Sequence, residues 1–129
     1  MNFNINLYRN IGYLTYAIAT SYGSNSKESI QLMKNDLIKS WYYLNERDIE
    51  NDSETYLQTE LIFNWLISHG FSSQFAWESF TDFVHQSSSK FELRYKEDLL
   101  LYSADISSKL YTNVQSDLII EKVSQILSL

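Results

Sequence analysis

The sequence is nearly free of the residues that interrupt helices. It contains no proline and only three glycines in 129 residues, at positions 12, 23 and 70. An all-β chain of many short strands would need glycine and proline turns at close intervals. We therefore predict an all-α fold.

The length and the absence of cysteine limit what holds such a fold together. A chain of 129 residues can bury about two thirds of the surface that its unfolded form exposes. The lack of cysteine excludes a disulfide framework, a thiolate zinc site and a cysteine nucleophile. We expect residues 1–129 to form one helical domain around a hydrophobic core.

The charge balance argues against two classes of partner. Ten basic and sixteen acidic residues give a formal charge of −6, which repels phosphate backbones and anionic membrane surfaces. No segment reaches the roughly 20 apolar residues that a membrane span needs, and MNFNINLYRN at the N-terminus does not resemble a secretory signal. We expect an acidic cytoplasmic protein with no membrane span and no nucleic-acid partner.

Apolar residues recur with helical periodicity along the whole chain. In the first helix, Phe3 to Tyr22, they fall at Leu7, Ile11, Leu14 and Ile18, and Gly23 follows. Because this helix is apolar nearly all round, we expect other helices to bury it. Five more helices are predicted at about 26–44, 53–69, 73–86, 91–111 and 116–127, which gives a bundle of about six helices around a buried first helix.

For two of these helices the sequence also predicts which residues face the core. In the second, Ile30, Met33, Leu37, Trp41 and Leu44 should face the core, with Lys27, Lys34, Asp36 and Lys39 mostly off that face, and Asn25 with Glu28 is typical of a capping box. In the third, the row expected to face the core is Leu57, Leu61, Ile62, Trp65 and Leu66.

The first two and last two helices align weakly at an offset of 89 residues. Tyr22 falls on Tyr111 and Glu28 on Asp117, for example. Two pseudo-symmetric helical hairpins would explain such matches, and so would chance similarity between amphipathic helices.

One segment resembles a known family. The string NIGYLTYAIATSYGSNSKESIQLMK, with Ala17, Ile18, Ala19, Gly23 and Glu28, resembles the first helical hairpin of the TerB-like, tellurite-resistance family. Ala104, Ile106 and Asp117 resemble its degenerate second copy. The resemblance implies an all-helical fold over the whole chain and a role in a bacterial stress response.

The family also implies a divalent-metal site, but this chain departs from its pattern. Where family members place an acidic residue just before the glycine, this sequence has Tyr22. Glu28 is then the carboxylate nearest this loop, and Asp117 joins it if the two hairpins face one another. The alternative is that Glu28 caps its helix and that Asp117 favours the positive end of its own.

Other candidate sites are weaker. The acidic run Glu46, Asp48, Glu50, Asp52 and Glu54 lacks the glycine and the final glutamate of a calcium-binding loop. His69 and His85 are 16 residues apart, and no nucleophile can be identified beside them. His69 near a helix C-terminus would complement the helix dipole.

The sequence leaves two functions open. The first is a non-enzymatic helical protein-interaction module that binds through exposed aromatic residues and needs no cofactor, since tryptophan and tyrosine anchor many interfaces. The alternative is a divalent-metal-binding sensor or metal-dependent hydrolase using Glu28 and Asp117. The partner protein is not identified by the sequence, and a homodimer is compatible with either function.

Overall fold

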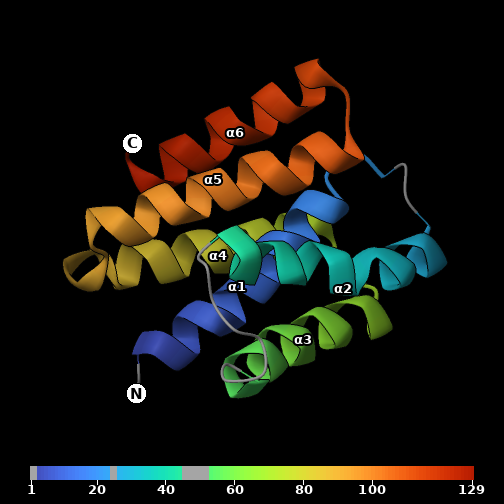
Figure 1. Cartoon of the computed structure of the whole chain (residues 1–129), viewed down its shortest axis with the longest axis horizontal. Helices are drawn as coiled ribbons and strands as arrows, with labels where there is room; N and C mark the ends of the chain where they lie inside the picture. The colour runs from blue at the N-terminus through green and yellow to red at the C-terminus, as the bar shows by residue number, and fades with distance from the viewer. Residues whose placement is uncertain (1–2, 24–25, 45–52) are drawn as a thin grey trace.

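The computed structural model describes residues 3–23, 26–44 and 53–129, which form six α-helices and one short 3₁₀-helix (Figure 1). Their bounds are α1 Phe3–Ala19, α2 Lys27–Leu44, α3 Ser53–Ser68, α4 Ser73–Gln86, η1 Ser88–Lys90, α5 Leu93–Leu110 and α6 Asn113–Leu127. These ranges contain no strand. The prediction of an all-α bundle of about six helices is confirmed.

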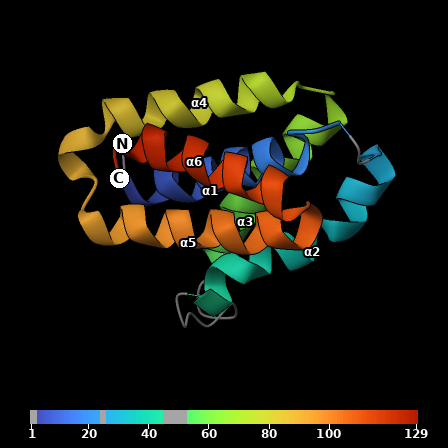
Figure 2. The ribbon, with the colours of Figure 1, turned by 90° about the horizontal axis from the view of Figure 1, so that it is seen from above.

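Helix α1 runs through the middle of the bundle, between α3, α4 and α5 (Figures 1 and 2). The row predicted to be buried, Leu7, Ile11, Leu14 and Ile18, is at most 1% exposed. The buried side chains form one hydrophobic cluster to which all six helices contribute. Burial of the first helix, predicted from its apolar surface, is therefore confirmed.

The two pairs of helices in the suspected repeat are packed differently. Helices α5 and α6 lie side by side as a hairpin, and Thr112 and Gln115 form a capping box that starts α6 three residues before the predicted Ser116. Helix α1 makes most of its contacts with α3 and α4 and few with α2. The aligned residues Tyr22 and Tyr111 do meet, with ring centroids 4.9 Å apart.

Local chemistry explains where several helices begin and end. Gly23 and Gly70 follow α1 and α3 with φ of +63° and +65°, the left-handed conformation that glycine adopts without a steric penalty. The Ser26 hydroxyl accepts a hydrogen bond from the Ser29 amide and so caps α2. Asn25, the predicted cap, lies outside the described residues, as do positions 45–52 of the acidic run.

Two expectations about α2 are wrong. Lys34 was expected off the buried face, yet it is only 9% exposed, because its ammonium group donates to Asn64 at 3.2 Å and pairs with Glu60 at 3.3 Å. Leu44 was expected inside and is 38% exposed at the end of the helix. A buried lysine is tolerated here because α3 supplies a carboxylate and an amide oxygen.

Within the described ranges, no helix combines the length and the apolar character that a bilayer crossing requires.

Candidate functional site

The outward face of α3 carries a row of large apolar side chains. Leu57, Leu61 and Trp65 follow one another at four-residue intervals and are 47%, 51% and 39% exposed. They were expected to face the core, and that expectation is wrong. We call these three residues the α3 row.

Of the row expected to face the core, Leu66 is buried and Ile62 is half-buried, and they lie on the face of α3 that packs inward. Phe63 and Leu66 are fully buried, and Thr59 is buried as well because its hydroxyl donates to the Tyr8 carbonyl of α1 at 2.7 Å. The Thr59 backbone also lies close to Gly12 of α1, since a Cβ added at Gly12 would be 2.7 Å from the Thr59 carbonyl oxygen. A glycine and a hydrogen-bonded threonine thus let the two backbones approach, and this contact orients the α3 row toward solvent.

Aromatic rings extend the row toward α4. The Trp65 ring lies 4.7 Å from that of half-buried Phe71, which stacks on Phe75 of α4 at 4.5 Å between centroids. Tyr13 of α1 lies beyond Phe75, with its ring centroid at 6.4 Å. Burial raises the pKa of the Tyr13 hydroxyl, and nearby Arg9 partly offsets the increase. The row and these rings form one apolar surface.

Polar contacts border this surface and hold α3 in place. On one side the Arg9 guanidinium donates to Gln58 at 2.9 Å. On the other, Lys34 bridges α2 to Glu60 and Asn64. At the C-terminal end, a ring nitrogen of exposed His69 lies 3.0 Å from the Trp65 carbonyl, consistent with the predicted role at the end of the helix. The border is polar and the centre apolar, as in protein interfaces.

The residues predicted to bind a metal lie at the surface. Glu28 is exposed in the first turn of α2, and Asp117 is exposed on α6. Tyr22, at the position where the family has an acid, donates its hydroxyl to the Gln115 carbonyl at 3.1 Å and packs on Tyr111. No group of three or more potential ligands occurs in the part of the chain that the structure describes.

Metal binding through Glu28 and Asp117 stays a prediction, and a titration decides it. We expect the melting temperature to be unchanged by millimolar calcium, magnesium, manganese or zinc, because hard cations need several converging oxygens and zinc needs three or four converging protein ligands. A metal present at 100 times its Kd would stabilise the fold by about 2.7 kcal/mol. A rise in melting temperature that is lost in both Glu28→Gln and Asp117→Asn would contradict this expectation.

A groove of about 620 Å³ lies between α4 and α6. Lys122 lies over the Trp77 ring at 4.6 Å, and Glu78 and Asp82 line the same groove. The hydroxyls of Ser21 and Ser73 both donate to the Ala17 carbonyl. The Ser73 bond joins α4 to α1, and the Ser21 bond is local to the end of α1. The lining residues of the groove include no imidazole.

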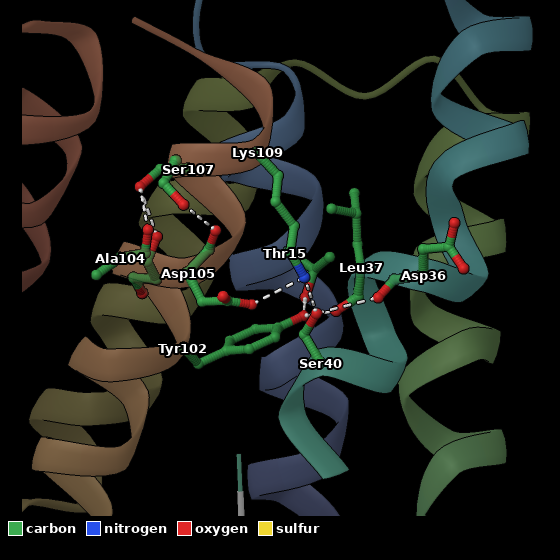
Figure 3. Close-up of polar contacts among 11 residues, drawn as sticks. Thr15, Asp36, Leu37, Ser40, Tyr102, Ala104, Asp105, Ser107 and Lys109 are labelled. Carbon is green, nitrogen blue, oxygen red and sulfur yellow. Dashed lines mark hydrogen bonds and ion pairs between the residues drawn. The ribbon is translucent and has the colours of Figure 1, made fainter. Parts of the chain in front are cut away.

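A polar cluster, buried at Tyr102 and Thr15 and open to solvent at Lys109, joins α5 to α1 and α2 (Figure 3). The Tyr102 hydroxyl donates to the Leu37 carbonyl at 2.9 Å and lies 2.7 Å from the Thr15 hydroxyl. Beside it, the Lys109 ammonium donates to Ser40 at 2.7 Å and pairs with Asp105 at 3.0 Å. Complete burial raises the pKa of Tyr102 well above its ordinary value. With Tyr102 inaccessible to solvent, this cluster supports the packing of the helices.

Sequence reasoning named the three residues of the α3 row but assigned them to the core. Apolar residues lie on both sides of this helix, so its own sequence does not show which side faces α1. His85 and Asp82 of α4 are both exposed, and neither has a side-chain contact with the other among the described interactions.

Comparison of the chain with family models, curated proteins and solved structures finds no match.

Proposed function

We propose that this chain is a non-enzymatic protein-interaction module that binds a partner protein through the α3 row. The observation that carries the proposal is the exposure of Leu57, Leu61 and Trp65 on a single helix face. Folded monomers rarely expose contiguous large apolar surfaces without a use for them. A row of large side chains at four-residue spacing fits the groove or the apolar helix of a partner.

The chemistry of the surface supports an interface more than a catalytic centre. Trp65 is of the residue type most often found to dominate binding energy, and it is packed by Phe71 on one side. The polar groups around the row form two pairs, Arg9 with Gln58 and Lys34 with Glu60. Such groups can border an interface without a large desolvation cost, since their hydrogen bonds are already made.

The resemblance to the TerB-like family motivates a role in a bacterial stress response as part of this proposal. The described geometry supports the interaction surface independently of that resemblance. The alternative of a metal-dependent sensor or hydrolase rests on Glu28 and Asp117 and is decided by the titration above.

Site-specific photocrosslinking tests the location of the interface. With a benzophenone amino acid at position 61 we expect protein adducts in native extract, and at position 118 few or none. Leu118 on α6 is the matched control, because it is 54% exposed against 51% for Leu61. Equal labelling at the two positions would refute the α3 row as the binding surface.

A further inference from the structure

The exposed face of α3 has nearly the same pattern in both directions about Leu61. Leu57 and Trp65 lie four residues to either side of it, and Glu54 and Ser68 lie seven residues to either side, with His69 next. All five of these flanking residues are exposed. A face with this pattern is self-complementary under a twofold axis, as the interface of a symmetric dimer must be.

We propose that the α3 row binds a second copy of this chain, with the two α3 helices antiparallel and the twofold axis at Leu61. Leu61 of the two copies then meet at the axis, and Leu57 of each copy packs on Trp65 of the other. This inference rests on the proposed function and identifies the partner as the chain itself.

Charge selects the antiparallel orientation. Glu54 lies in the first turn of α3, and the opposite end of the row carries Ser68 and His69 and no acid. An antiparallel pair places each carboxylate beside the hydroxyl and imidazole of the other copy. A parallel pair would place the two Glu54 carboxylates side by side, and like charges at close range are unfavourable. The helix dipoles also favour the antiparallel orientation, because each helix end then lies beside the oppositely charged end of the other copy.

The size of the surface predicts a weak dimer. A helix of 16 residues is about 24 Å long, and one helix face with its flanking rings is smaller than the roughly 800 Å² per partner of a standard interface. Each copy also carries a formal charge of −6, which opposes association. We therefore expect a dissociation constant on the order of 10–100 µM.

Sedimentation equilibrium of the full chain between micromolar and submillimolar concentrations tests the dimer. We expect a reversible monomer–dimer equilibrium that Leu61→Glu weakens at least about 50-fold, because two carboxylates would meet at the axis. Leu118→Glu makes the same chemical change at a residue of matched exposure (54% against 51%) and should leave the equilibrium unchanged. Circular dichroism verifies that both variants remain folded.

Disulfide trapping tests the orientation, since the natural chain contains no cysteine. Under mild oxidation Leu61→Cys should form a covalent dimer rapidly, and Leu57→Cys alone slowly. Mixing Leu57→Cys with Trp65→Cys should restore rapid formation. Trapping of Leu57→Cys as fast as that of Leu61→Cys would overturn the antiparallel arrangement.

The outcomes separate this inference from the proposed function. A chain that stays monomeric throughout the concentration range, or a dimer equally weakened by Leu61→Glu and Leu118→Glu, overturns the self-association. If position 61 still photocrosslinks selectively to another protein, the interaction module stands with a different partner. If position 61 labels no more than position 118, the interaction surface fails as well.

Discussion

Replacing Gly12 with alanine is expected to destabilise the fold, although alanine is the better helix former. An added Cβ would lie 2.7 Å from the Thr59 carbonyl oxygen and 3.0 Å from the Ile62 Cβ. The helix preference of alanine contributes about 1 kcal/mol in favour of the variant. Because the closest atom belongs to the α3 backbone, α1 and α3 must separate, and overpacking of this kind costs about 1–3 kcal/mol. Gly12→Leu should cost more than Gly12→Ala in urea denaturation.

Gly23→Ala is the control that separates crowding from glycine's conformational freedom. Gly23 has φ of +63°, and among the described residues other than its chain neighbours no atom lies within 4 Å of an added Cβ. Its substitution should cost about 1 kcal/mol, from the left-handed backbone alone. Because the space around position 23 is open, Gly23→Leu should lower the free energy of unfolding little more than Gly23→Ala does. A Gly12→Ala variant more stable than the natural chain would contradict the close approach of α1 and α3.

The helices were predictable because their signals are local. Helical periodicity, the absence of proline and the positions of Gly23 and Gly70 depend only on neighbouring residues. The start of α6 was placed three residues late because Thr112 and Gln115 were not recognised as a capping box, although both residues are visible in the sequence. The start of α6 was therefore predictable from local sequence, through the capping box of Thr112 and Gln115.

The outward face of α3 was not predictable from its own sequence. Apolar residues occur on both sides of that helix, and periodicity alone favours Leu57, Leu61 and Trp65 as the inner row. The structure buries Thr59 instead, where its hydroxyl donates to the Tyr8 carbonyl, 51 positions away in the sequence. Lys34 is a similar case, because its burial depends on Glu60 and Asn64 of another helix. The burial of Thr59 and the burial of Lys34 both depend on polar contacts with another helix.

Tyr102 is expected to make the fold sensitive to alkali. Complete burial raises the pKa of its hydroxyl above the ordinary value of 10.0, so the folded chain retains this proton where the unfolded chain loses it. Below about pH 10 the hydroxyl is neutral in both states, and its contribution to stability is fully present. As pH rises further, the free energy of unfolding should fall by about 1.4 kcal/mol per pH unit from this group alone.

The Tyr102→Phe variant isolates that contribution. At neutral pH it should be less stable than the natural chain by about 1–2 kcal/mol, because the hydrogen bonds to Leu37 and Thr15 are lost. Above about pH 10 its stability should fall less steeply with pH, since the group that titrates is absent, so the two curves converge. Tyr43→Phe, at a residue 68% exposed, should be about as stable as the natural chain at neutral pH. Since the remaining tyrosines and lysines are common to both proteins, two parallel curves for Tyr102→Phe and the natural chain would mean that this hydroxyl is not buried as described.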